Sequence, residues 1–134
     1  MLAIWRQAGP NRGFAAGPAF DSLLNESFAA LHGEAARGKL LSWERDAPGA
    51  LALILLTDQI PRNIFRHSAH AFATDEMARN IADRAIARGF DQATEPALRL
   101  FFYLPFEHHK DAASQARAVA LCERLAAETG TKDW

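Results

Sequence analysis

Leu51-Ala-Leu-Ile-Leu-Leu-Thr-Asp-Gln-Ile-Pro-Arg-Asn63 is the stretch that decides how this chain folds. Six apolar residues come first, and the sequence turns polar at Thr57. A helix that is apolar on every side must be buried on every side, so the polar residues at its end lie near the middle of the protein. We therefore expect a central helix over residues 49–60. Pro61 lacks an N–H and disfavours helical geometry before it, so the helix should end or bend there.

Length and composition indicate one domain over residues 1–134. The chain has 49% hydrophobic residues and a net charge of −1, so nothing in its bulk charge favours nucleic acid or an acidic membrane as partner. The single cysteine excludes an internal disulfide and fits a reducing compartment. No signal peptide is visible, and the longest apolar run is far shorter than the ~20 residues of a membrane span. We expect a soluble cytoplasmic protein without a cofactor.

Further helices are expected before the central one. Residues 1–8 predict a short helical turn and residues 11–18 a loop. A helix is expected over residues 19–37, and Gly38 is a good stop signal after it. Its apolar stripe consists of Phe20, Leu23, Leu24, Ser27, Phe28, Leu31 and Ala35.

The connection to the central helix also carries signals. Residues 39–44 are expected to add a turn that buries Leu40 and Trp43. Asp46 is a plausible N-cap, and Pro48 suits the first helical turn after it.

A third helix is expected after the central one, capped by Ser68 or Thr74 and ending at Gly89. Its apolar stripe is Met77, Ala78, Ile81, Ala82, Ala85 and Ile86.

A second strongly apolar helix is expected over residues 95–104, closed by Pro105. Asp111 is the expected N-cap of the last helix, and Gly130 its C-cap. The buried face of that last helix should contain Gln115, Ala118, Val119, Cys122, Leu125 and Ala126.

The order of these helices suggests two similar halves. In each, an apolar helix is followed by a proline, a polar loop with histidine and an amphipathic helix; Pro61 and Pro105 are 44 residues apart. Two helical hairpins stacked side by side would bury both apolar helices. We therefore predict an all-α fold of about six helices in stacked antiparallel hairpins. The predicted core includes Leu53, Ile54, Leu56, Leu100, Phe101 and Leu104.

Polar residues at the ends of the two apolar helices are the candidate functional residues. Parallel stacking of the hairpins would gather them at one end of the bundle. They are Asp58, Gln59, Arg62, Asn63, Arg99, Tyr103, His108 and Gln115.

Two interpretations of this cluster remain open. In the structural one, Asp58 forms a buried ion pair with Arg62 or Arg99, while the amide side chains cap helix ends and loop carbonyls. In the functional one, Asp58 is a base or anchor, the arginines hold an anionic group, and His108 with Tyr103 transfers protons. We expect the carboxylate of Asp58 to be satisfied by arginine and backbone N–H groups, which favours the structural role.

Metal and nucleophile sites are not indicated. His67 and His70 are three residues apart, but no ligand motif accompanies them. His108 and His109 are adjacent and point to different sides of the chain. Cys122 lies on an apolar helical stripe, where a thiol is unreactive. Phosphate-binding glycine loops and nucleophile elbows are absent from the sequence.

Several segments together resemble an uncharacterised bacterial family. They are Leu51 to Arg66, Ala71-Phe-Ala-Thr-Asp75, Gly89-Phe-Asp91, Arg99 to His108, Phe20-Asp21, Gly38-Lys-Leu40 and Trp43. The chain is similar to the domain of unknown function 924, which is placed among all-helical, TPR-like proteins. The resemblance implies a TPR-like right-handed superhelix. Family members usually continue into a further C-terminal segment, which this chain is expected to lack, and His109-Lys110 stands where a Ser-Glu pair is common.

Two classes of function follow from these observations. The first is a TPR-like scaffold that binds a protein or peptide, or a second copy of itself, and it rests on analogy of fold. The alternative is an enzyme or small-molecule binder that uses the polar cluster. The first predicts a concave, partly apolar surface between the hairpins. The second requires titratable groups beside a ligand.

Overall fold

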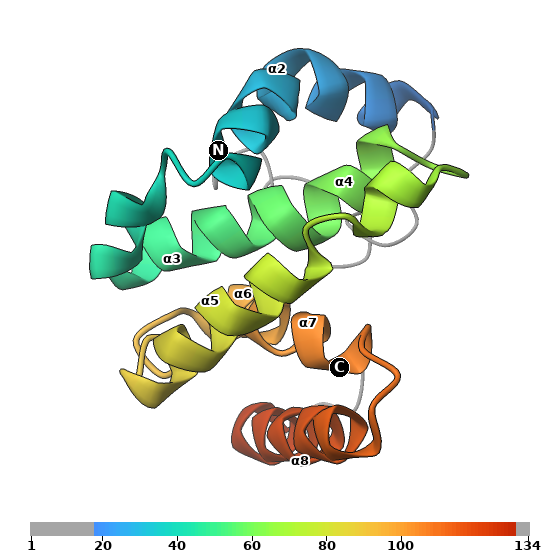
Figure 1. Ribbon diagram of the computed structural model, residues 1–134. Coiled ribbons are helices and arrows are strands. Elements are labelled where there is room, and N and C mark those ends of the chain that lie inside the picture. The colour runs from blue at the N-terminus through green and yellow to red at the C-terminus, as the bar shows by residue number, and fades with distance from the viewer. Residues whose placement is uncertain (1–17, 131–134) are drawn as a thin grey trace.

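The computed structural model describes residues 18–130, and these form helices and turns without a strand (Figure 1). The predicted all-α fold is confirmed. The helical turn expected over residues 1–8, and the following loop as far as residue 17, lie outside the described residues. No described helix is both long enough and apolar enough to cross a membrane.

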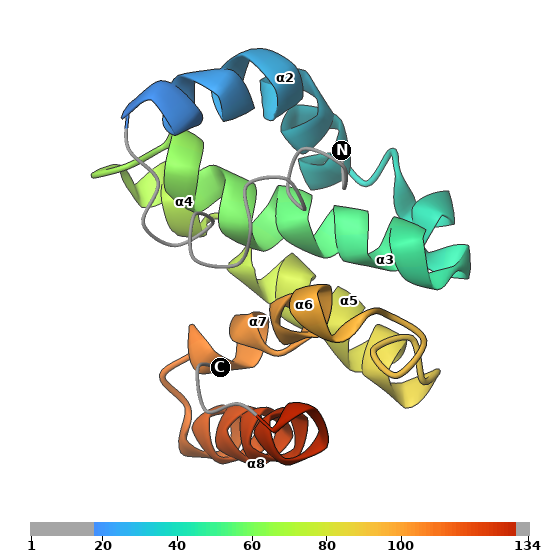
Figure 2. The same cartoon turned by 180° about the vertical axis from the view of Figure 1, so that it is seen from behind.

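The helices lie one upon the next in chain order (Figures 1 and 2). Helix α2 packs on the segment α3–η2–α4, α5 contacts that segment and α7, and α8 contacts α6 and α7. The elements are α2 (Pro18–Ala36), η1 (Leu41–Arg45), α3 (Ala47–Ile54), η2 (Leu55–Gln59), α4 (Ile60–Ile64), η3 (Ala69–Phe72), α5 (Asp75–Ala87), α6 (Pro96–Arg99), η4 (Leu100–Phe102), α7 (Leu104–Glu107) and α8 (Ala112–Thr129).

The apolar core forms where the sequence predicts it. Every residue from Ala50 to Pro61 is buried, which agrees with a helix covered on all sides. All six predicted core residues are at most 5% exposed: Leu53, Ile54, Leu56, Leu100, Phe101 and Leu104. Leu40 and Trp43 pack against this core, as expected.

Predicted cap residues define several helix ends. Asp46 accepts a hydrogen bond from the N–H of Gly49 (2.8 Å) at the start of α3, and Asp111 accepts one from the N–H of Ser114 (3.1 Å) at the start of α8. Left-handed glycines follow α2, α5 and α8, at Gly38, Gly89 and Gly130.

The central helix continues beyond Pro61, which differs from the predicted end near Ile60. The turn η2 is π-helical, and the N–H of Ile60 bonds to the carbonyl of Leu55, five residues back. This turn places Pro61 in the first turn of α4, where its missing N–H does not interrupt the hydrogen-bond pattern. The chain therefore remains helical to Ile64.

The second apolar helix is also divided. It consists of α6, the 3₁₀ turn η4 and α7, and Pro105 lies in the first turn of α7. The prediction that Pro105 closes a helix is wrong, for the same reason as at Pro61: a non-α turn precedes the proline and provides a new helix start.

Three residues of the predicted buried stripes are exposed, namely Val119, Leu23 and Ser27. Val119 of α8 is 55% exposed and Leu23 of α2 is 43% exposed. Helices α2 and α8 are the outermost elements in both views of the fold (Figures 1 and 2), so each buries a narrower stripe than its sequence suggests. Ala118 and Leu125 form the fully buried part of α8.

Candidate functional site

The π-helical turn leaves backbone carbonyls that side chains bind. The carbonyl of Leu56 accepts no backbone hydrogen bond from Ile60 or Pro61, the fourth and fifth residues after it. The N–H of Ile60 bonds to the carbonyl of Leu55, and Pro61 has no N–H. His32 donates to the carbonyl of Leu56 through Nδ1 at 2.7 Å. In an α-helix the carbonyl of Thr57 would accept from the N–H of residue 61, which is a proline without one. This carbonyl instead accepts a hydrogen bond from the hydroxyl of Thr74 at 2.6 Å. These two bonds hold α2 and α5 against the turn.

Asp58 lies within this turn and is 0% exposed. Its Oδ1 accepts hydrogen bonds from Nη1 of Arg62 at 3.1 Å and Nδ1 of His108 at 2.8 Å. Its Oδ2 accepts from Nε2 of Gln59 at 3.1 Å. Both oxygens are therefore satisfied, as expected, but Gln59 and His108 take the place of the expected backbone N–H groups.

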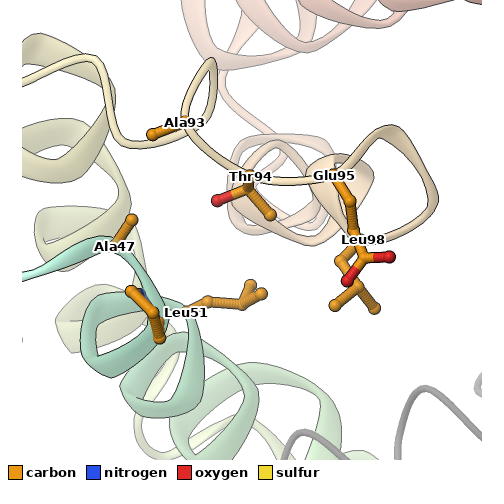
Figure 3. Close-up of a pocket in the computed structure, with 7 residues that line it drawn as sticks. Ala47, Leu51, Ala93, Thr94, Glu95 and Leu98 are labelled. Carbon is orange, nitrogen blue, oxygen red and sulfur yellow. The ribbon is translucent and has the colours of Figure 1, made fainter.

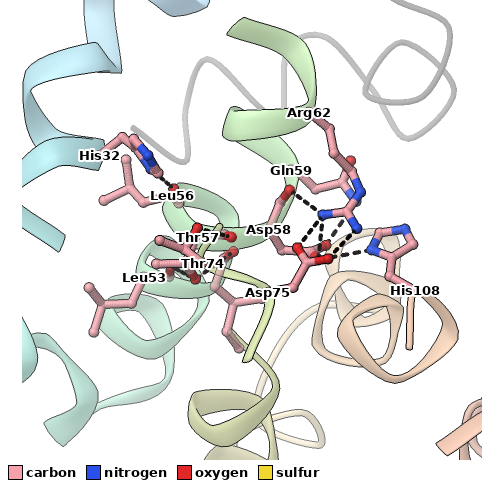
Figure 4. Close-up of polar contacts among 11 residues, drawn as sticks. His32, Leu53, Leu56, Thr57, Asp58, Gln59, Arg62, Thr74, Asp75 and His108 are labelled. Carbon is pink, nitrogen blue, oxygen red and sulfur yellow. Dashed lines mark hydrogen bonds and ion pairs between the residues drawn. The ribbon is translucent and has the colours of Figure 1, made fainter. Parts of the chain in front are cut away.

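Arg62 lies between two carboxylates (Figure 4). Its Nη1 and Nη2 form a bidentate pair with Asp75 at 2.8 and 2.9 Å, and Nη1 also donates to the carbonyl of Asp58 at 2.9 Å. The guanidinium carbon is 5.4 Å from the ring centroid of Phe72. Such fork-shaped contacts fix a guanidinium in position. Arg62 therefore joins the central helix to α5 and holds the carboxylate of Asp58 in place.

His108 has 23% of its side chain exposed, close to the 21% of Arg62, whereas Asp58 is buried. A carboxylate can only accept hydrogen bonds, so the Nδ1 that contacts Asp58 carries a proton. In the neutral ring, Nε2 then has a free lone pair. No described residue bonds to Nε2, and Figure 4 shows that nitrogen on the side of the ring away from Asp58. This imidazole is oriented by a buried carboxylate and can accept a proton from a bound molecule.

Tyr103 and Arg99 belong to a different polar group. The hydroxyl of Tyr103 donates to Oδ2 of Asp91 at 2.7 Å, and both residues are buried. Burial first, and then the hydrogen bond to Asp91, raises the pKa of the Tyr103 phenol above its ordinary value. Arg99 pairs with Glu128 at 2.8 Å and donates to the carbonyl of Thr94 at 3.0 Å. The ion pair of Arg99 with Glu128 joins α6 to α8, and the hydrogen bond of Tyr103 with Asp91 joins the start of α7 to the turn after α5.

The remaining two candidates are placed separately. Gln115 donates from Nε2 to the carbonyls of Glu107 and His109, both at 2.6 Å, and so fixes the loop before α8. Asn63 is buried in α4. The structure thus brings four of the eight candidates together, namely Asp58, Gln59, Arg62 and His108.

Three residues that bind the cluster or the π-helical turn were not predicted as partners from the sequence, namely Asp75, Thr74 and His32. Each has a weak signal: Thr74 and Asp75 lie in a segment that resembles the family, and Thr74 was a candidate helix cap. Asp75 is an acidic residue at the start of a helix, and His32 interrupts the apolar stripe of α2 four residues after Phe28. Their roles depend on the π-helical turn, which the sequence does not reveal.

A separate pocket of about 170 Å³ lies between the beginnings of α3 and α6 (Figure 3). Leu51 and Leu98 give it an apolar wall, and Thr94 and Glu95 supply its polar side. The lining residues are Ala47, Pro48, Leu51, Ala93, Thr94, Glu95 and Leu98.

Comparison with known proteins agrees with this architecture. A family model described as "Bacterial protein of unknown function (DUF924)" matches residues 1–133. The chain belongs to this family. A solved structure of a protein of unknown function from Agrobacterium tumefaciens is similar to this DUF924 protein, with 48% identity and a TM-score of 0.90, over 92% of this chain and 70% of that one. No curated protein matches the sequence. The resemblance noted in the sequence is thus confirmed.

Proposed function

We propose that this DUF924 protein binds a small molecule in the cytoplasm and transfers a proton to or from it at His108. The observation that supports this most is the 2.8 Å contact between Nδ1 of His108 and the buried Oδ1 of Asp58. A histidine held by a carboxylate on one nitrogen, with the other nitrogen open, is the arrangement that general bases use.

The three residues have distinct roles in this proposal. His108 is the base, and Asp58 is a positioning residue that keeps the proton on Nδ1 and stabilises the imidazolium once formed. Arg62 orients Asp58 through its 3.1 Å contact with Oδ1. General base catalysis of this type typically contributes about 10²–10⁴-fold to a rate.

Chemical modification tests the proposed base without knowledge of the substrate. Diethyl pyrocarbonate acylates free imidazole nitrogens, and mass spectrometry reads the rate at each histidine. We expect His108 to react much faster than His32, which is 9% exposed and engaged through Nδ1. Asp58→Asn should slow the reaction of His108, because the amide no longer fixes the tautomer. Equal rates at His108 and His32, or no effect of Asp58→Asn, would refute the proposal.

Stability separates a functional Asp58 from a structural one. Arg62 keeps its bidentate pair with Asp75 in Asp58→Asn, so no arginine is left without a partner. If Asp58 is functional and locally unfavourable for folding, Asp58→Asn should leave the stability of the protein unchanged or raise it, while ligand binding is lost. A loss of several kcal/mol, as for a broken buried pair, would assign Asp58 a structural role. Urea unfolding of the variant distinguishes the two.

The competing function is a TPR-like scaffold that binds a protein or peptide. The pocket between α3 and α6 favours it, since it is concave, partly apolar and formed by both halves of the chain. Ala93→Arg would fill this pocket, and His108→Gln serves as the matched control. A partner recovered from lysate by the wild type and by His108→Gln, but not by Ala93→Arg, would support the scaffold. Light scattering tests self-association, the other form of this function.

A further inference from the structure

We infer that the molecule bound at His108 is an organic amine that arrives as an ammonium ion and rests against the ring of Phe72. This inference rests on the proposed function and adds the chemical class of the ligand. Three observations support it: the charge balance of the cluster, the exposed aromatic ring at its edge, and the free lone pair of His108.

The charge balance favours a cation. Two carboxylates, Asp58 and Asp75, face one guanidinium, that of Arg62. With His108 neutral, the cluster carries one uncompensated negative charge. Asp75 has 21% of its side chain exposed, so this charge reaches the surface. An anion placed there would meet like charge, whereas an ammonium ion would neutralise it.

Phe72 provides an exposed aromatic ring next to Arg62, which pairs with both carboxylates. It is 59% exposed, one of the few large apolar side chains so exposed among the described residues. The guanidinium of Arg62 lies near the ring at 5.4 Å, while the exposed area remains open to solvent. A cation over an aromatic face is attracted by the ring quadrupole, and nearby carboxylates strengthen its binding. Phe72 also follows His70 in the short turn η3, which presents both side chains at the surface.

The hydrogen-bonding capacity of His108 agrees with the same ligand class. Its Nδ1 is committed to Asp58, so a neutral ring offers only a lone pair at Nε2. An ammonium N–H can donate to that lone pair. In the transfer step, the N–H bond of the ligand breaks, its electron pair stays on the amine nitrogen, and the proton forms a bond with Nε2. The products are a neutral, nucleophilic amine and an imidazolium that Asp58 stabilises.

Binding of three matched probes tests the charge preference. Benzylammonium, benzyl alcohol and benzoate share a phenyl ring and differ in charge. Each is titrated into the full chain while the His108 ring resonances are followed by NMR, with His108→Gln used for assignment. We expect saturable shifts with benzylammonium at concentrations about ten-fold or more below those needed for benzoate. Tighter binding of benzoate, or equal binding of the alcohol, would overturn the inference.

Variants of the edge residue test where the ligand rests. Phe72→Leu should weaken benzylammonium binding about two- to five-fold, since an exposed cation–π contact is of that strength. Val119→Ala, an exposed apolar change on α8, is the control and should leave binding unchanged. Because Phe72 is exposed, its replacement should not prevent folding, which circular dichroism checks. Unchanged binding in Phe72→Leu would remove the aromatic surface from the proposal.

The two proposals can fail separately. Rapid acylation of His108 without a preference for benzylammonium would overturn the ligand class and leave the base in place. Slow acylation of His108 would overturn the proposed function itself. Protection of His108 from acylation by benzylammonium, and not by benzoate, would support both.

Discussion

The hydrogen bond from Thr74 to the carbonyl of Thr57 predicts a specific energetic coupling with Pro61. The bond is 2.6 Å long and buried, and Pro61 cannot serve this carbonyl in its place. Thr74→Val keeps the shape of the side chain and leaves the carbonyl without this donor, at a cost of roughly 1–3 kcal/mol. Pro61→Ala restores an N–H in the same turn. Thr74→Val should therefore cost less in the Pro61→Ala background, with a coupling energy of about 1 kcal/mol or more.

Urea unfolding of the four proteins in this double-mutant cycle measures the coupling. For a domain of this size, Thr74→Val alone should lower the midpoint by roughly 0.5–2 M. Thr94→Val is the matched control, because its hydroxyl donates to the carbonyl of Phe90 at 2.8 Å, away from Pro61. Its cost should be equal in both backgrounds. Additivity of Thr74→Val and Pro61→Ala within about 0.5 kcal/mol would show that the missing proline N–H is not the reason for this bond.

Two further predictions concern packing and pH. A Cβ at Gly49 would lie 2.0 Å from the carbonyl oxygen of Trp43, so Gly49→Ala should destabilise the protein by at least about 1–3 kcal/mol in thermal unfolding. Gly33→Ala is the contrasting variant, because its Cβ meets only a flexible side chain at 3.4 Å. It should stabilise the protein by about 0.5–1 kcal/mol. The raised pKa of Tyr103 contributes stability that is present below pH ~10 and is lost as pH rises above it. The unfolding free energy of the wild type should therefore fall more steeply above pH ~10 than that of Tyr103→Phe, in which Asp91 loses its donor. Parallel curves of unfolding free energy against pH for the two proteins would contradict this.

Local signals predicted several helix ends, though not those expected at Pro61 and Pro105, because the groups that decide them are neighbours in sequence. The left-handed glycines at Gly38 and Gly89 and the cap at Asp46 depend on residues within a few positions. The apolar run of the central helix likewise predicts burial on all sides, since its composition leaves no polar face. These features need no knowledge of the rest of the fold.

The candidate site was only partly predictable because its partners come from distant helices. Asp58 and Arg62 are four residues apart, so their pairing follows from helical spacing. The contacts with Asp75 and His108 depend on how α5 and α7 pack, which periodicity does not specify. Arg99 was a candidate partner of Asp58, yet it pairs with Glu128. The sequence thus predicted which residues need partners more reliably than which partners they take.

The π-helical turn accommodates one residue more than a regular turn without changing the direction of the helix around it. Deletion of a single residue from Leu55–Gln59 would replace the wide turn by a regular α-helical turn and leave the helix on either side of it in register. Among relatives, a one-residue gap at this position would therefore mark a protein that has kept the fold without the π-helical turn, even if every other residue were identical.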